Sequence, residues 1–208
     1  NIVDYGPLLR AALVSLDAWA SKGTAPPASA FPRLDNGTAV LPEPLGGFYK
    51  KIPGATFAAR FVRPSVLDFG PDIARGIAAY PAKTGEQYKA YVSAIDADGN
   101  ELAGIVPVEV AAPLATFTGW NPRHPDQGAA DDLMQMRGST LVFARTRAAR
   151  EQSGDPRLSI EERYASKGAY LEAARTAAQK LVAARWVLAD DIEPILERAT
   201  LRWDFLVK

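Results

Sequence analysis

The sequence predicts a mixed α/β chain with a strand-rich middle and a helical tail. Three observations lead to this fold class. An amphipathic stripe of helical period lies near the start, short extended segments broken by Gly and Pro fill the middle, and a longer helical stripe occupies the last third. We therefore expect three regions: 1–33 (a helix and a Pro-rich linker), 34–139 (strands and loops) and 140–208 (a helical cap).

The composition narrows the function classes. The chain has 208 residues with 48% hydrophobic and 23% charged residues, which is typical of a globular protein. Its 24 basic residues are matched by 24 acidic ones, so no basic excess favours nucleic acid as a partner. No apolar run approaches the ~20 residues that span a bilayer, so no membrane span is expected. The absence of cysteine excludes disulfides, thiolate zinc sites and a cysteine nucleophile.

The start of the chain gives no cellular address. It begins Asn1-Ile2-Val3 without an initiator methionine, and it lacks the basic start and apolar core of a signal peptide. We expect any targeting segment to lie upstream of Asn1, and the compartment stays open.

The first element is an amphipathic helix over residues 7–22. Leu9, Leu13, Leu16 and Ala20 fall on one stripe, and Gly23 is suited to the position just after the helix end. Residues 24–33 are too rich in proline for a helix or a central strand, which indicates a linker.

The middle region reads as short extended pieces over residues 34–119. The clearest is a hairpin of residues 88–95 and 101–106, whose turn at residues 96–100 contains Asp-Gly followed by Asn. Residues 108–117 are expected to form another extended piece. Residues 118–128 then form a Gly/Pro-rich loop.

The tail reads as helices. A short basic helix is expected over residues 143–152, ended by Ser153 and Gly154. Ser159 and Glu162 have the spacing of a capping box, and a long apolar stripe begins at about Lys167. Two aspartates, at 190 and 191, open a last helix with a proline in its first turn.

The sequence shows no complete catalytic set. No serine lies in Gly-x-Ser-x-Gly, the motif that exposes a nucleophile on a strand-to-helix turn. His124 is the only histidine, and Asp126 follows it closely. Acting as a base beside Asp126 is one interpretation of His124. We favour the other, a loop histidine between two prolines, because no activated nucleophile accompanies it.

Two charged clusters also have ordinary explanations. Asp96 to Glu101 resembles the opening of a calcium loop, but its glycine comes too early and the distal ligand position falls on Pro107. Arg145, Arg147 and Arg150 are able to form an anion site, although such a group is more often a solvated face paired with nearby glutamates. We expect neither a metal nor any other cofactor.

The loop from Thr118 to His124 is the best candidate for contacts with a substrate. Trp120 offers a large apolar face with one donor, and Asn121 offers an amide. We therefore predict Thr118, Trp120, Asn121 and His124 as binding residues. The alternative is a buried tryptophan that closes the core.

Several segments in order resemble the C-terminal half of bacterial alpha/beta-hydrolase-domain proteins. They are residues 13–27, 96–105, 113–121, 143–147 and 154–164, and together they span nearly the whole chain. The Trp-x-x-x-Gly-x-x-Pro element from Trp19 to Pro26 also resembles the helix end that follows the catalytic histidine in tannase-like and feruloyl-esterase-like hydrolases.

This resemblance implies an α/β sheet scaffold and hydrolysis of a small-molecule ester or related acyl bond. It also implies that the nucleophile, the acid and the histidine all precede Asn1, so the upstream catalytic half of the same protein would be the partner. No catalytic position carries over to these residues. A rival interpretation is a self-standing binding or interaction module without catalysis.

Overall fold

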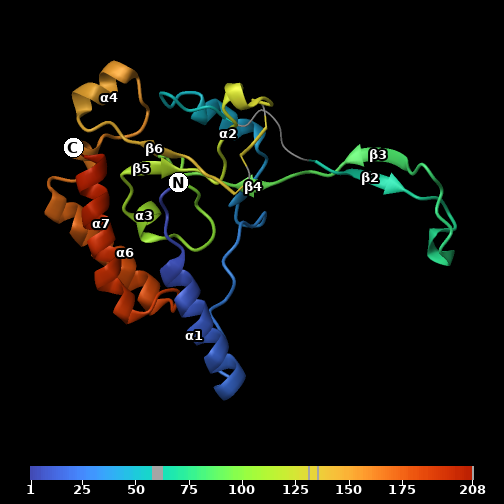
Figure 1. The fold of residues 1–208 in the computed structure, drawn as a ribbon, viewed down its shortest axis with the longest axis horizontal. Helices are drawn as coiled ribbons and strands as arrows, with labels where there is room; N and C mark the ends of the chain where they lie inside the picture. Colours follow the sequence, from blue (N-terminus) through green and yellow to red (C-terminus); the bar gives the residue numbers. More distant parts are fainter. Residues whose placement is uncertain (58–62, 131, 135, 208) are drawn as a thin grey trace.

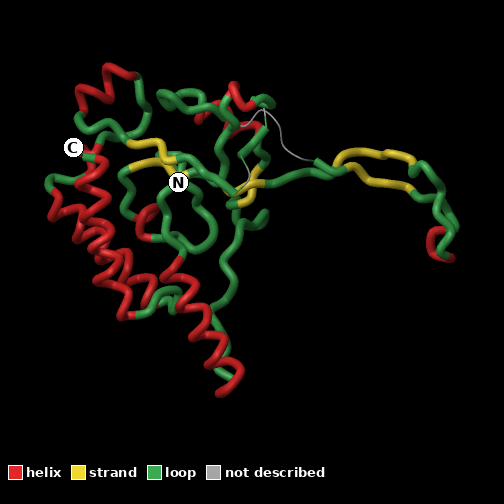
Figure 2. Tube along the Cα trace, viewed as in Figure 1, coloured by secondary structure: helices red, strands yellow, loops and turns green. Residues whose placement is uncertain are grey.

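The computed structural model describes residues 1–57, 63–130, 132–134 and 136–207. It has a mixed α/β structure in which the C-terminal helices gather at one side of the body (Figure 1, Figure 2). The helices are α1 (Gly6–Lys22), α2 (Glu43–Tyr49), α3 (Val108–Ala111), α4 (Arg147–Ser153), α5 (Ile160–Arg163), α6 (Lys167–Ala183) and α7 (Ile192–Leu206). The strands are β1 (Ala39–Val40), β2 (Ser65–Asp68), β3 (Lys83–Gln87), β4 (Val92–Ser93), β5 (Ala115–Phe117) and β6 (Thr140–Val142).

The strands of the described residues form small antiparallel pairs. β1 pairs with β4, β2 with β3, and β5 with β6. In the β5–β6 pair Thr116 lies opposite Leu141, and all three residues of β5 are buried. Strand β5 therefore lies inside the body with β6 partly exposed beside it, whereas β2 and β3 stand away from the body (Figure 1).

The hydrophobic core lies between α3, α6 and α7. Tyr170, Ala174 and Ala178 of α6 are fully buried, as the apolar stripe predicted. Tyr170 packs on Trp203 of α7, with ring centroids 5.2 Å apart. No helix in the described part of the chain is both long and apolar enough to cross a bilayer.

The bounds of α1 agree with the sequence, but its apolar stripe does not face this core. The helix ends at Lys22, and Gly23 takes a left-handed φ of 69° that caps it. Its buried residues are Pro7, Ala11 and Ser15, on the side opposite the predicted stripe. Leu13 is 67% exposed and Leu9 64% exposed. The leucine stripe is therefore an uncovered apolar surface.

The predicted hairpin of residues 88–106 is confirmed beside its turn but is shorter than expected. Ile95 and Glu101 form an antiparallel bridge, and the Leu102 N–H donates to the Ala94 carbonyl at 2.9 Å. Farther from the turn, β4 pairs with β1. Asp96 Oδ1 accepts hydrogen bonds from the backbone N–H of Asp98 and of Asn100, at 2.8 and 2.9 Å. The carboxylate thus organises the turn, and the residues directly beside the turn pair with each other.

Three further predictions are wrong in secondary structure. Residues 43–49 form a helix inside the region expected to hold strands and loops. Residues 108–111 form the short helix α3, so only residues 115–117 of the expected extended piece are a strand. The basic helix begins at Arg147 rather than at Phe143, because residues 140–142 pair with β5.

The end signals of the tail are confirmed. Gly154 caps α4 with a φ of 67°, and the Ser159–Glu162 capping box is present. The bonds from Ser159 to the Glu162 carboxylate lower its pKa to about 2. The long helix begins at Lys167, as its stripe predicted.

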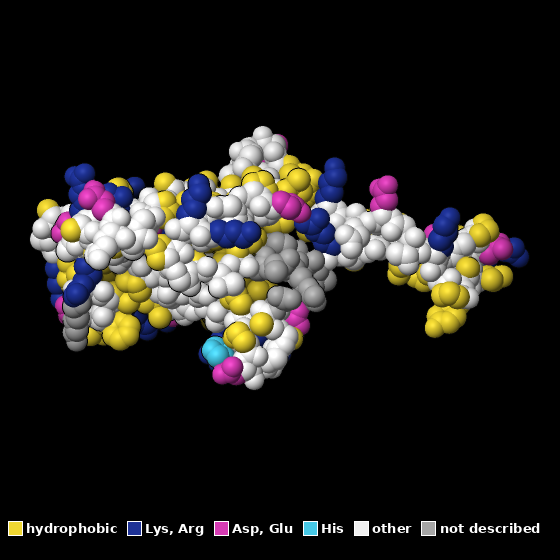
Figure 3. All heavy atoms as spheres, turned by 90° about the horizontal axis from the view of Figure 1, so that it is seen from above, with side chains coloured by type: hydrophobic (Ala, Val, Ile, Leu, Met, Phe, Trp, Pro, Cys, Tyr) yellow, Lys and Arg dark blue, Asp and Glu magenta, His cyan; other side chains and the backbone are white. Residues whose placement is uncertain are grey.

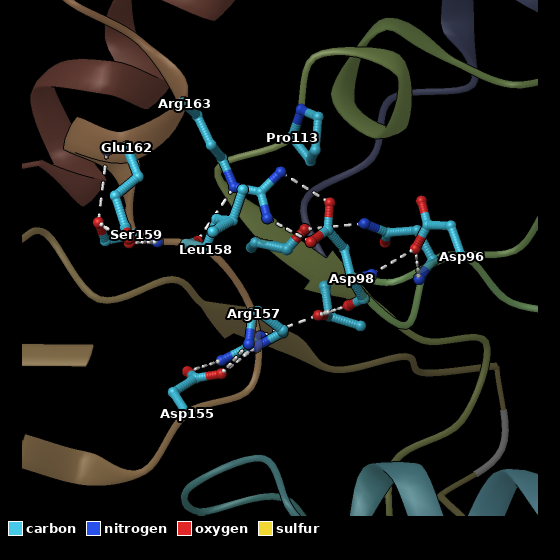
Figure 4. A network of polar contacts seen from close by, with 12 residues as sticks. Asp96, Asp98, Pro113, Asp155, Arg157, Leu158, Ser159, Glu162 and Arg163 are labelled. Carbon is cyan, nitrogen blue, oxygen red and sulfur yellow. Dashed lines mark hydrogen bonds and ion pairs between the residues drawn. The ribbon is translucent and has the colours of Figure 1, made fainter. Parts of the chain in front are cut away.

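A buried polar network ties the residues before α5 to the β5–β6 pair (Figure 4). The Arg157 guanidinium makes two bonds to Asp155, from Nε to Oδ1 at 2.9 Å and from Nη2 to Oδ2 at 2.6 Å. It also donates to Thr116 Oγ1 at 2.8 Å and to the Leu141 carbonyl at 2.7 Å. Burial raises the pKa of Asp155, but the bonds from Arg157 outweigh it and hold that pKa below its ordinary value.

A second ion pair fastens the turn of residues 96–100 to α5. Arg163 donates from Nη1 to Asp98 Oδ2 at 2.8 Å, and its guanidinium lies 4.3 Å from the centroid of the Phe143 ring. Figure 4 shows Arg163 and Asp98 facing one another across the network. The Asp98 carboxylate that resembled a calcium ligand therefore holds the tail in place.

Candidate functional site

The loop after β5 lines a hollow of about 400 Å³ at the surface. Three of the four residues predicted for substrate contact line it together: Trp120, Asn121 and His124. The fourth, Thr118, is buried behind them and borders a smaller neighbouring hollow of about 170 Å³. The structure thus brings three of the predicted residues to one surface and places the fourth beneath it.

Trp120 serves as a wall of the hollow and as a packing residue at once. Its side chain is half-buried, and its ring meets the rings of Tyr49 and Phe57 edge to face at 5.1 and 5.4 Å. Tyr49 in turn donates to the Gly99 carbonyl at 2.7 Å. Burial raises the pKa of Tyr49 well above its ordinary value, so this phenol stays neutral and holds the wall in place.

Hydrogen bonds fix the backbone and amide of the loop. Thr118 Oγ1 donates to the Trp120 carbonyl at 2.5 Å and accepts from the Ser139 backbone N–H at 2.9 Å. The Ser139 hydroxyl lies 3.2 Å from Asn121 Oδ1 and 3.3 Å from the Trp120 carbonyl. Both are acceptors, so the Ser139 proton is committed to the loop. Asn121 thus contributes an amide to the wall of the hollow beside Ser139.

His124 is an exposed turn residue in this arrangement. Its Nδ1 accepts the backbone N–H of Asp126 at 3.3 Å, which caps a short 3₁₀ turn at Pro125–Gln127. Its side chain is 68% exposed, and that of Asp126 is 88% exposed. The Asp126 carboxylate lies 3.5 Å from Nδ1, so it would pair with His124 only when the imidazole is protonated. This geometry supports a turn role and gives no buried base.

The predicted arginine cluster pairs with acidic neighbours. Arg147 Nε lies 2.8 Å from Glu151, and Arg150 Nε lies 2.8 Å from Glu162. The backbone N–H of Arg147 also donates to Glu161 at 2.6 Å. Glu151, Glu161 and Glu162 are therefore the nearby glutamates that pair with this face.

A larger hollow of about 730 Å³ lies between the loop at residues 104–106 and α6. Its walls include Ile105, Ala173 and Trp186, with Glu172 and Lys180 among the polar groups. A site that orients a polar ester needs several convergent donors and acceptors. The hollow beside Trp120 offers more of these groups for its size, so we consider it the better candidate.

Sequence reasoning missed the other residues that line the hollow beside Trp120. Gly54 and Thr56 follow α2, Ser139 and Leu141 come from the β6 segment, and Met134 comes from the loop between them. They lie far from the Trp120 loop along the chain, and no local motif connects them to it. The run from Thr140 to Phe143, which holds two β-branched residues and an aromatic one, would have indicated a strand beside the loop.

The family described as alpha/beta hydrolase domain matches residues 1–197. No curated protein and no solved structure matches the chain.

Proposed function

Because the chain belongs to the alpha/beta hydrolase domain family, we propose that it is the C-terminal, non-catalytic portion of a hydrolase that cleaves small-molecule esters or related acyl compounds. In this proposal the nucleophile, the acid and the catalytic histidine lie in an upstream half of the same protein. The present residues complete the scaffold and shape the substrate pocket, which excludes water from the acyl chemistry.

One observation carries this proposal: the only imidazole of a hydrolase-family chain caps a turn of its own loop. The ester hydrolases of such a family need a base that reaches a nucleophilic hydroxyl. His124 uses Nδ1 for the Asp126 backbone, and the sequence has no Gly-x-Ser-x-Gly motif. The Ser139 hydroxyl, which lines the same hollow, is bonded to the Trp120 loop.

The uncovered face of α1 supports the scaffold part of the proposal. A helix that carries leucines at helical spacing normally buries them. Here Leu9, Leu13 and Leu16 are exposed, whereas Arg10 on another face of α1 pairs with Asp191 at 2.6 Å. We propose that the leucine face packs on the upstream half, with residues 1–33 as the last scaffold helix and linker, 34–139 as an excursion and 140–208 as a cap.

Activity-based labelling tests the division of labour. We expect a fluorophosphonate probe to label one serine of the complete protein, upstream of Asn1, and no serine of the isolated 1–208 chain. Tandem mass spectrometry of the labelled peptide identifies the site, and intact mass with N-terminal sequencing shows whether an upstream polypeptide is present. A label on any serine from Ser15 to Ser166 would contradict the proposal.

Truncating Trp120 tests the pocket. Because its ring is half-buried against Tyr49 and Phe57, we expect Trp120→Ala to cost less than the ~3–5 kcal/mol of a fully buried aromatic. We also expect kcat/KM of the complete protein to fall roughly tenfold, about 1.4 kcal/mol of lost transition-state binding.

The matched control for this variant is Trp203→Ala, which removes a partly buried indole from the α6–α7 core. It should lower the melting temperature and leave kcat/KM of the folded fraction unchanged. Equal kinetics in the two variants would remove the support for a pocket role of Trp120.

A further inference from the structure

The strands β2 and β3 form an arm that projects from the body (Figure 1). We call residues 64–88 the arm. Backbone hydrogen bonds join its two sides along their length. At the base the Tyr88 N–H donates to the Pro64 carbonyl at 2.9 Å, and near the tip the Ala79 N–H donates to the Phe69 carbonyl at 2.6 Å. Ser65 lies opposite Gln87 and Asp68 lies opposite Lys83. Each strand therefore has backbone hydrogen-bond partners along its inner edge, which faces the other strand.

The arm has no covered apolar face. In β2 and β3 every residue except Ser65 is exposed. Large apolar side chains are exposed along the arm, and hydrophobic side chains gather at its far end (Figure 3). They are Val66, Leu67, Phe69, Ile73, Ile77 and Tyr80. An isolated two-stranded hairpin is marginal in water, whereas three or more strands with an apolar face are stable, so a further strand would stabilise the arm.

The two outer edges of the arm differ in their suitability for pairing. The edge formed by β3 carries Lys83 and Glu86, and charged side chains are a common protection against strand addition. The edge formed by β2 offers Val66 and Leu67. Its one charged residue, Asp68, bends its carboxylate to the Gly70 N–H at 2.8 Å. The β2 edge is therefore the one open to another strand.

We propose that the arm is a dimerisation element, in which β2 pairs antiparallel with β2 of a second copy of this chain about a twofold axis. The two arms would then form a four-stranded sheet. A twofold axis brings identical edges together, so one symmetric contact satisfies both β2 edges. This inference is independent of whether the chain contributes to catalysis.

The same symmetry accounts for the apolar ends of the arm. Antiparallel pairing of the two β2 strands places the tip of each arm beside the base of the other. The tip carries Ile73 and Ile77, and the base carries Tyr88 and Tyr91, all exposed in the single chain. The symmetric contact therefore covers the β2 edge and both sets of apolar side chains in each copy.

Single cysteines in the complete protein test the pairing. These 208 residues contain no cysteine, so each new thiol is the only one in them. We expect Val66→Cys, Leu67→Cys or Asp68→Cys to give a covalent homodimer on mild oxidation, because residues near the axis approach within disulfide range. Leu158→Cys, which is 49% exposed on the body, is the control and should stay monomeric, as should the unsubstituted protein on a non-reducing gel.

Light scattering on the complete protein supplies a second measurement. We expect a dimer whose dissociation constant rises at least 100-fold in the Val66→Lys/Leu67→Lys variant, with an unchanged circular dichroism spectrum of the body. A monomeric unsubstituted protein at 50 µM would overturn the proposal. A dimer that stays intact in the lysine variant would also overturn it. Arm cysteines that crosslink only within one chain would overturn it as well, because the arm would then pair with the upstream polypeptide.

Discussion

Replacing Arg157 by methionine should destabilise the protein by about 3–5 kcal/mol, the usual effect of breaking a buried ion pair. The Arg157 side chain is 2% exposed and the Asp155 side chain 5% exposed. Methionine keeps much of the apolar stem but provides no donor. The buried Asp155 carboxylate would keep its 3.0 Å bond from the backbone N–H of residue 157 but lose both guanidinium bonds, and a buried charge without its countercharge carries a large desolvation penalty.

The control for Arg157→Met is Arg147→Met. Arg147 also pairs with a glutamate, at 2.8 Å, but its side chain is 67% exposed, so we expect a change of about 0–1 kcal/mol. Urea denaturation of both variants gives the free energies of unfolding. Equal effects in the two variants would show that the network of Figure 4 adds nothing beyond a surface pair.

The cost of Arg157→Met should also depend on pH. In the unsubstituted protein the Asp155 pKa is lowered, so its contribution to stability is present above the unfolded value of about 3.9 and is lost as the pH falls through the folded value. Without the Arg157 side chain, the side-chain bonds and charge that lower the pKa of Asp155 are lost, so this pKa rises relative to that in the unsubstituted protein. The stability deficit of the variant therefore grows as the pH rises, and it should be larger at pH 7 than at pH 3.

Local signals predicted the helices of the tail, but tertiary contacts decided α2 and α3. The capping residues Ser159 and Gly154 act within a few residues of themselves, so the sequence alone reveals them. Helix α2 contains two glycines in its seven residues, which disfavour helix. It is held by Tyr49, which is buried against Phe57 and bonded to Gly99. Such partners are distant in sequence and leave no local pattern.

The candidate site likewise contains residues that local signals indicate and residues that only tertiary contacts bring together. Trp120, Asn121 and His124 were found because Gly and Pro mark their loop and because their side chains suit a binding surface. Ser139 was missed as a partner because the pairing of β5 with β6 brings it there. The stripe on α1 was also found, but the sequence indicates only that it needs a cover and does not identify the cover.

The last prediction concerns that stripe, and its effect should depend on the rest of the protein. In the isolated chain Leu13 and Leu16 are more than half exposed, and glutamate is a good helix former. We therefore expect Leu13→Glu/Leu16→Glu to change the stability of the 1–208 chain by less than about 0.5 kcal/mol. In the complete protein the upstream half would cover both leucines, and burial of each contributes roughly 1.5–3 kcal/mol.

The same double substitution should therefore cost the complete protein on the order of 3–6 kcal/mol, with a further penalty for carboxylates at an apolar contact. Ser21→Glu is the control, because Ser21 is exposed on α1 to one side of the leucine stripe. It should be nearly silent in both proteins. Chemical denaturation of the four variant proteins beside the two parents measures the difference between contexts. If the double variant were equally mild in both, the leucine face would be solvated in the complete protein, and the proposed docking of α1 on an upstream half would be wrong.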